Sequence, residues 1–213
     1  EHFGKNIVAH SPGLGQQVRN FNECGFEFIK EPDGDVITNE FWFDTPPLLV
    51  SEMAYTHESL DLLLREGEVY LNQYTHIRYA VLLNIESQNG IVQSVRFILC
   101  ARLEPEDLAK AQAIFSDQRK NDCKKKFGNL RLRYGQLKQM NSQEIEQWYN
   151  FRIVADHTVY RNDIHEVSFQ LSAALLFQYT PYEGMYTDEF TVTISTQDIT
   201  RIFNAPPNPR LRH

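Results

Sequence analysis

The sequence predicts an α/β fold of the α+β kind, in which a central mixed β-sheet is flanked by helices. Two observations carry this prediction. An apolar stretch at 48–54 precedes a helix-like segment and then a second apolar stretch at 77–86, which is the order of a crossover between two strands. The second stretch leads into Gln88-Asn89-Gly90, a tight hairpin turn, and 91–103 returns as the partner strand.

Length and composition are those of a folded chain. The 213 residues are 42% hydrophobic and 23% charged, which provides a core and excludes wholesale disorder. The net charge of −7 excludes a uniformly basic nucleic-acid coat, although a local basic face remains possible. We predict a single domain over 1–213, made of a core at 8–103, a helical basic insertion at 104–151, C-terminal strands at 152–203 and an irregular tail at 204–213.

The first elements are predicted from capping and periodicity. Ser11-Pro12 is typical of a helix start, and the spacing of Leu14, Val18 and Phe21 predicts a helix that ends near Cys24-Gly25. Two strands follow, at 26–30 and 36–43, separated by the turn Glu31-Pro32-Asp33-Gly34.

The middle of the chain holds the crossover. Asp44-Thr45-Pro46-Pro47 ends the preceding strand, and 48–54 reads as a strand buried on both faces. Thr56 is a suitable cap for the next helix. One side of that helix is apolar, with Leu60, Leu63, Leu64, Tyr70 and Leu71.

The second half is more mixed. Helix signals begin at Pro105 and cover 142–151, and 153–159, 167–177 and 191–195 read as strands or mixed segments. Thr196-Gln197-Asp198 is expected to cap a short final helix.

Acidic residues gather around the strands of the first half, at Asp33, Asp35, Glu40, Asp44 and Glu52. Glu52 interrupts the apolar run at 48–54, and an ionised acid there must be paired, bound to a metal or placed at the rim. A hard divalent ion is held by one or two carboxylates together with waters and phosphate oxygens. Two carboxylates on adjacent strands would therefore build such a site.

These segments resemble the restriction-endonuclease-like PD-(D/E)XK nuclease superfamily, in its branch of small nuclease-like proteins. The resemblance rests on Pro32-Asp33, on the apolar strand and Glu-x-Ala-Tyr at 47–55, on the Leu-rich helix, and on the apolar strand at 79–85. It covers roughly half of the chain and implies a nuclease-like core that binds nucleic acid, DNA or RNA.

The resemblance also implies site residues. Glu52 matches the acid of the (D/E)XK element, and Asp33 or Asp44 matches the preceding acid, so these three are the candidate catalytic residues and ligands for Mg²⁺ or Mn²⁺. A hairpin of 36–43 with 48–54 would instead place Glu40 opposite Glu52. Ala54 stands where the family has its Lys, with Lys30, Arg65 and His57 as conceivable substitutes.

The missing Lys leaves other interpretations open. The chain is a metal-dependent phosphodiester hydrolase, or a catalytically inactive nuclease-like fold that serves as a protein-interaction module in a larger assembly. A third possibility is an unrelated α/β scaffold, in which the acids are surface charges. The structural alternative for Glu52 is a strand-end acid in a salt bridge to Arg65 or Arg78.

A basic run lies in the predicted insertion. Residues 119–138 contain eight Lys or Arg and one acid, and the residues predicted to contact nucleic acid are Arg119, Lys120, Lys124, Lys125, Lys126, Arg131 and Arg133. Phosphate contacts would make binding salt-dependent. The alternative partner for this run is an acidic protein.

Other classes of protein are excluded or disfavoured. Three separated cysteines argue against a disulfide scaffold and favour a reducing compartment, so we expect an intracellular location, nuclear or cytoplasmic. The apolar stretches are far shorter than the ~20 residues of a membrane span, so no membrane partner is expected. Because the chain begins at Glu1 rather than Met, we expect a processed piece or an engineered fragment, in which any lost targeting segment would not be visible.

Overall fold

The chain adopts an α+β fold in a computed structural model. The structure describes residues 7–10, 18–21, 27–30, 33–38, 47–55, 60–71, 77–104, 141–146, 149, 151–178 and 182–205.

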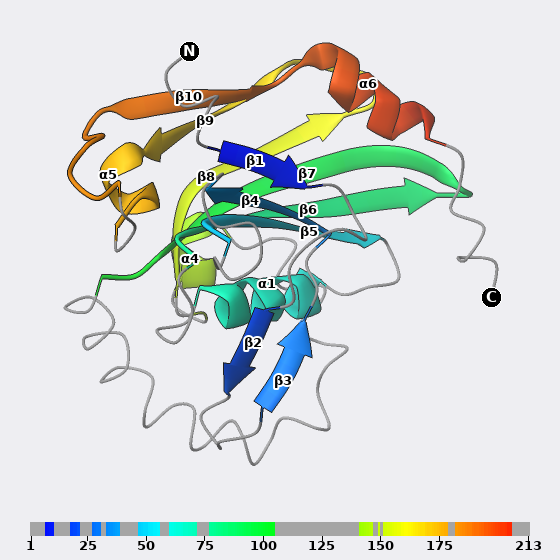
Figure 1. Cartoon of the computed structure of the whole chain (residues 1–213). Coiled ribbons are helices and arrows are strands. Elements are labelled where there is room, and N and C mark those ends of the chain that lie inside the picture. Colours follow the sequence, from blue (N-terminus) through cyan, green and yellow to red (C-terminus); the bar gives the residue numbers. More distant parts are fainter. Residues whose placement is uncertain are drawn as a thin grey trace.

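The central feature is a mixed sheet whose strand order is β1-β4-β5-β6-β7-β8 (Figure 1). Its strands are β1 (Ile7–His10), β4 (Gly34–Thr38), β5 (Leu49–Tyr55), β6 (Tyr79–Gln88), β7 (Ile91–Arg102) and β8 (Phe151–Tyr160). Strands β5 and β6 are parallel, and all other neighbours in this sheet are antiparallel. A parallel pair needs a crossover connection, and helix α1 (Leu60–Tyr70) lies in that connection.

Smaller elements complete the described part of the chain. Strands β2 (Val18–Phe21) and β3 (Glu27–Lys30) form an antiparallel pair, as do β9 (Val167–Ser172) and β10 (Glu189–Ile194). Helices α4 (Ser142–Glu146), α5 (Ala173–Leu176) and α6 (Thr196–Asn204) belong to the second half.

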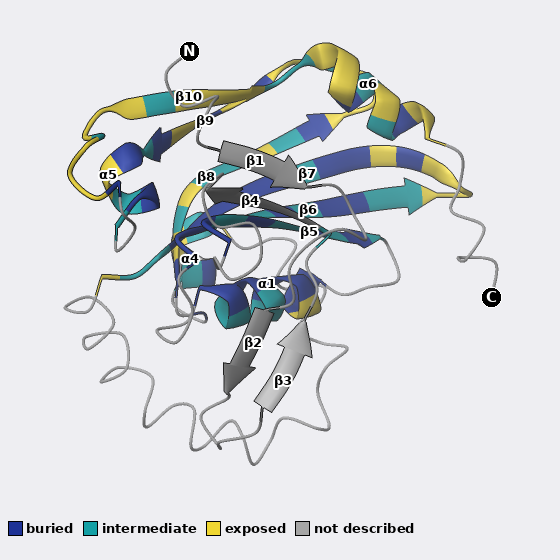
Figure 2. Ribbon diagram, in the orientation of Figure 1, coloured by how far each residue is buried: buried dark blue, intermediate teal, exposed yellow. Residues whose placement is uncertain are grey.

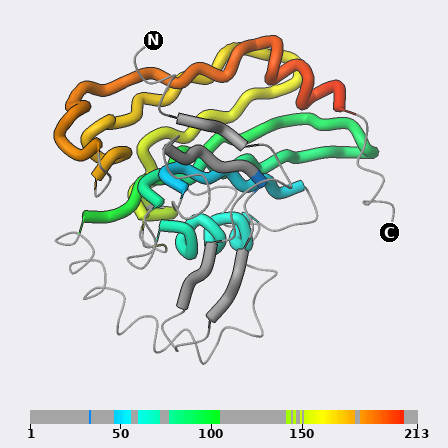
Figure 3. Tube along the Cα trace, in the orientation of Figure 1, coloured from blue at the N-terminus to red at the C-terminus, as the bar shows by residue number. Residues whose placement is uncertain are grey.

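The two faces of the main sheet are covered by different elements. Helices α1 and α4 pack on one face, where Val50, Leu82 and Ile98 join a core with Leu63 and Leu64. The opposite face carries an apolar core under β9, β10, α5 and α6, and the segment from β9 to α6 runs across that face in Figure 3. Figure 2 shows that exposed residues follow the outer strand β10 and the outer side of α6.

Helix α1 packs closely on the sheet because of a glycine. A Cβ at Gly67 would lie 2.9 Å from the Leu82 side chain of β6, which is closer than normal carbon contacts. The glycine therefore lets the helix approach the sheet at the parallel β5–β6 pair.

Several predicted elements are confirmed. The mixed sheet flanked by helices, the strand at 48–54, the following helix and the 77–103 hairpin are all present. The hairpin turn has positive φ at Asn89 (53°) and Gly90 (75°), as expected for Asn-Gly in a two-residue turn.

Other predictions were wrong in part. The helix predicted over 11–24 is contradicted by strand β2, because a short pattern of apolar residues is compatible with either period once a partner strand is present. The helix predicted over 142–151 ends at Glu146, and Phe151 begins β8. The final helix is capped by Ser195, whose side chain accepts a hydrogen bond from the Asp198 amide. Most of the predicted insertion, at 105–140, lies outside the described residues.

Two adjacent leucines of α1 test this packing. Leu63 is 1% exposed and Leu62 is 48% exposed. Leu63→Ala should lower the free energy of unfolding by about 2–5 kcal/mol, because it leaves a cavity between α1 and the sheet. Leu62→Ala is the matched control and should change it by less than about 0.5 kcal/mol. Urea unfolding measures both, and equal losses would contradict the packing of α1.

Candidate active site

The register of β4 and β5 places an acid beside Glu52. Gly34 lies opposite Ser51 and Asp35 lies opposite Val50, so continuing this antiparallel register by one residue puts Asp33 opposite Glu52. The Asp33 carboxylate is held there, since its Oδ2 accepts a hydrogen bond of 2.9 Å from the amide of Met53. Among the described residues, Asp33 is thus the predicted acid that lies next to Glu52.

Glu52 lies on the side of β5 that faces helix α1. Burial alternates along this strand, and Val50, Glu52 and Ala54 all lie on its buried face. Glu52 is 6% exposed, and its Oε2 accepts a hydrogen bond of 3.0 Å from the hydroxyl of Tyr70 at the end of α1. A buried carboxylate requires such donors because burial without them is costly.

The electrostatic effect of these acids is visible at Tyr70. Burial raises the pKa of this hydroxyl far above its usual value, and the charge of Glu52 and the hydrogen bond to it raise that pKa further. The charges of Glu66 and Asp33 act in the same direction. Several carboxylates therefore act on one buried hydroxyl, which keeps its proton and stays a donor to Glu52.

A second buried carboxylate, Asp61 of α1, can be compared with Glu52 of β5. Asp61 is buried and accepts a hydrogen bond of 2.7 Å from the Tyr149 hydroxyl and another of 2.7 Å from Nε of Arg65. Arg65 neutralises Asp61 in this arrangement, which is typical of a structural ion pair. Arg65 was also a predicted partner of Glu52 or a substitute for the missing Lys, and its ion pair with Asp61 argues against both roles.

The other predicted site residues have different outcomes. The hairpin register that would put Glu40 opposite Glu52 is contradicted, because β4 pairs with β5 through Asp35 and Val50. Asp44, Glu40 and His57 lie outside the described residues. The predicted nucleic-acid contacts also lie outside them, namely Arg119, Lys120, Lys124, Lys125, Lys126, Arg131 and Arg133. Ala54 is 3% exposed, so a buried methyl group stands at the position where the resemblance would place a Lys.

Tyr70 was missed as a polar group of this site. Its place on the apolar side of the predicted helix indicated a core residue, and its hydroxyl gave no separate signal in the sequence. Among the described residues, no group of three or more His, Cys, Asp or Glu side chains is arranged to hold a metal ion. The candidate site therefore consists of Asp33 and Glu52, with Tyr70 fixing the second.

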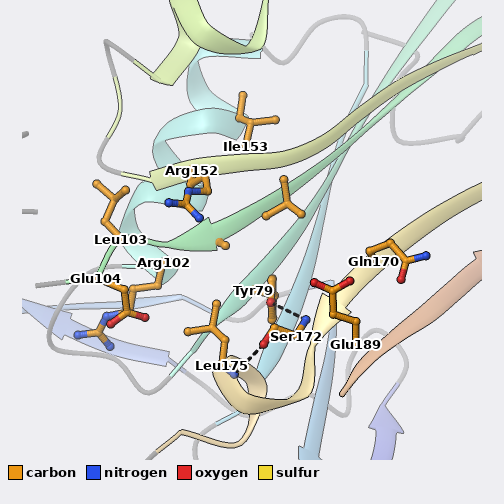
Figure 4. Close-up of a pocket in the computed structure, with 12 residues that line it drawn as sticks. Tyr79, Arg102, Leu103, Glu104, Arg152, Ile153, Gln170, Ser172, Leu175 and Glu189 are labelled. Carbon is orange, nitrogen blue, oxygen red and sulfur yellow. Dashed lines mark hydrogen bonds between the residues drawn. The ribbon is translucent and has the colours of Figure 1, made fainter. Parts of the chain in front are cut away.

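A cavity of about 480 Å³ lies on the face of the main sheet opposite helix α1, between the end of β7, the start of β8 and the start of α5 (Figure 4). Ser172 is held there on both sides, because its amide donates to the Tyr79 hydroxyl at 3.0 Å and its Oγ accepts from the Leu175 amide at 3.3 Å. The charged residues that line this cavity are two bases and two acids, Arg102, Arg152, Glu104 and Glu189. This balance favours neither an anionic nor a cationic ligand.

The raised tyrosine pKa values predict a loss of stability at high pH. The unfolded state releases a tyrosine proton near pH 10, whereas Tyr70 and Tyr149 keep theirs in the folded protein. The unfolding free energy is therefore fully retained below pH 10 and falls above it, by about 1.4 kcal/mol per pH unit for each tyrosine. Tyr70→Phe should remove one such contribution from the slope, measured by urea unfolding between pH 9 and 11.5. Tyr160→Phe, at a tyrosine that is 55% exposed, is the control. If the unfolding free energy of Tyr70→Phe fell with pH as steeply as that of the parent, the buried environment assigned to Tyr70 would be wrong.

Comparisons with protein-family models, with curated proteins and with solved structures give no match for this chain. None of the described helices is long and apolar enough to cross a membrane.

Proposed function

We propose that this chain is a nuclease-like domain of the PD-(D/E)XK kind, which binds nucleic acid and hydrolyses a phosphodiester bond with Mg²⁺ or Mn²⁺. One observation carries the proposal: the Asp33 carboxylate bonds to β5 at Met53, directly beside Glu52. The order of strands β4 and β5, helix α1 and strand β6 supports the resemblance to a restriction-endonuclease-like core, with the basic segment and the later strands as additions to it.

The residues present fit a hard divalent cation. Such an ion needs one or two protein carboxylates, and waters and phosphate oxygens supply the remaining ligands. Asp33, the residue directly before β4, and Glu52 of β5 provide two carboxylates at neighbouring positions. An ionised carboxylate has about four lone-pair positions, so one accepted hydrogen bond, from Tyr70 to Glu52 or from the Met53 amide to Asp33, does not by itself prevent metal ligation.

In the proposed hydrolysis, the metal ion and the side chains of the protein have different roles. When bound, the ion would polarise the phosphate and lower the pKa of an attacking water. Asp33 and Glu52 would hold it, Tyr70 would orient Glu52, and the Met53 amide would orient Asp33. Ala54 contributes no positive charge, so transition-state stabilisation by a Lys at this position is absent.

Ala54 favours a second candidate function. A nuclease-like fold that lacks this cation would serve as a catalytically inactive protein-interaction module in a larger assembly. The basic residues at 119–138 would then dock an acidic protein rather than nucleic acid.

Conservative carboxylate variants test the metal site. Glu52→Gln and Asp33→Asn keep side-chain shape and can still accept the bonds from Tyr70 and Met53, but each removes a charge. We expect Mn²⁺ to raise the thermal midpoint of the parent protein and each variant to lose most of that rise. Cleavage of a labelled oligonucleotide should fall at least about 100-fold, which corresponds to roughly 2.7 kcal/mol of transition-state stabilisation.

Asp198→Asn is the matched control, because Asp198 is an acid of the distant helix α6 paired with Arg201 at 3.0 Å. It should behave as the parent does. A Mn²⁺ effect without cleavage in the parent would favour the inactive candidate. Absence of any Mn²⁺ effect would overturn the metal site.

Charge reversal tests the basic segment. Changing Lys124, Lys125 and Lys126 together to Glu should weaken oligonucleotide binding and reduce the slope of log K against log salt by up to about 3, if each lysine neutralises one phosphate. Arg201→Glu, at an exposed residue of α6, is the control for a charge reversal outside the basic segment. Fluorescence anisotropy at several salt concentrations measures the binding of both variants. Parent-like binding by the triple variant would show that the basic segment is not the contact surface.

A further inference from the structure

A second cavity, of about 510 Å³, lies on the α1 side of the main sheet. Leu60 at the start of α1 lines it, together with six polar side chains from β6, β7 and β8: Asn84, Glu86, Ser94, Arg96, Asp156 and Thr158. Asn84 is paired with Ala54 of β5 on one side and with Arg96 of β7 on the other. The cavity therefore begins beside Ala54, two residues along β5 from Glu52.

Asn84 is an unusual residue for the middle of a sheet. It is 3% exposed, and its Oδ1 has no hydrogen-bond partner within the described part of the chain. A buried amide oxygen without a donor is costly, and the large majority of buried side-chain polar atoms have a partner. This oxygen has almost no surface that a water molecule can reach in the free protein. A ligand in the cavity that Asn84 lines can provide the missing bond once the side-chain amide turns over and presents the oxygen to the cavity.

The charges around Asn84 disfavour a phosphate as that ligand. Arg96 is engaged with Asp156 through two hydrogen bonds, of 2.8 Å from Nε and 2.6 Å from Nη2. The Ser142 hydroxyl donates to the same carboxylate at 3.1 Å. Glu86 adds a further acid, so the described lining has two acids and one base, and its guanidinium is already neutralised.

The remaining groups suit a planar, uncharged ligand. Asn84 offers an acceptor and a donor side by side, which is how Asn pairs with the edge of a nucleobase. Tyr160 also lines the cavity and is 55% exposed, and exposed aromatic rings stack on unpaired bases. We infer that this cavity binds an unpaired nucleobase, with Asn84 reading its edge and Tyr160 stacking on its face.

This inference deepens the proposed function, because it names a nucleic acid with an unpaired base as the substrate class. The base site and the carboxylate pair use different residues, and a free nucleoside requires no metal ion. Binding of nucleosides can therefore be measured separately from metal binding and cleavage.

The experiment titrates adenosine, cytidine, guanosine and uridine into the full chain without metal, with binding followed by protein NMR. At least one nucleoside should bind in the millimolar range or tighter. Asn84→Leu should weaken it at least tenfold, and Tyr160→Ala should weaken it several-fold. Gln170→Leu, at the cavity on the opposite face, is the control and should bind as the parent does.

Asn84→Leu has a second expected effect. Replacing a buried amide that lacks a partner by an apolar side chain of similar size should raise the thermal midpoint of the free protein by about 3 °C or more. A lower midpoint would show that the amide is satisfied in the free protein and would overturn its assigned role.

Other results would also overturn the base site. The first is that none of the four nucleosides binds. The second is that free ribose binds as tightly as the nucleoside, or that the nucleoside monophosphate binds tenfold more tightly than the nucleoside. The third is that Asn84→Leu and Tyr160→Ala both bind the nucleoside as the parent does. Glu52→Gln separates the two proposals: nucleoside binding by this variant together with loss of its Mn²⁺ response would support both. Nucleoside binding without any Mn²⁺ response in the parent would leave the base site standing and remove the hydrolase.

Discussion

The burial of the Glu52 carboxylate against the Tyr70 hydroxyl is the interaction on which the architecture of this side of the molecule depends. It joins the centre of β5 to the last residue of α1, and α1 is the crossover between the only two parallel strands of the described sheet. An ionised carboxylate in an apolar layer is tolerated only where donors or cations compensate its desolvation. The position of α1 over β5 and β6 is therefore tied to the chemistry of one acid.

The two faces of the sheet divide structure from chemistry. The face under β9, β10 and α6 is a continuous apolar core, and Ile199 and Phe203 anchor α6 to it. The face under α1 and α4 also has an apolar core, but it includes Glu52, Asn84 and the Arg96–Asp156 pair. Both proposals arise on this second face, where the sheet carries polar groups that a purely structural core would not need.

Strong local signals made much of this fold predictable. Asn89-Gly90 specified the hairpin turn, and the leucine spacing specified helix α1. The capping signal at Ser11-Pro12 and the spacing of Leu14, Val18 and Phe21 predict a helix over 11–24, whereas residues 18–21 form strand β2. Its pairing with β3 is a tertiary effect that the sequence does not encode locally.

The candidate site was predictable only in part, because register depends on pairing between strands. Glu52 stood out as an acid in an apolar strand, but the preference for Asp33 over Glu40 required the alignment of β4 with β5. Asp44 lies outside the described residues. Asn84 gave a similar signal, as a polar residue inside the apolar strand at 77–86, yet without its neighbours it could not be related to a cavity. Tyr70 resembled any other core aromatic residue.

The most direct test of the central claim is anomalous X-ray diffraction from a crystal of the protein soaked in Mn²⁺. We expect a manganese peak within direct ligand distance of carboxylate oxygens from both Asp33 and Glu52. The contradicting result is a crystal in which β4 and β5 keep their pairing but no manganese lies between these two carboxylates.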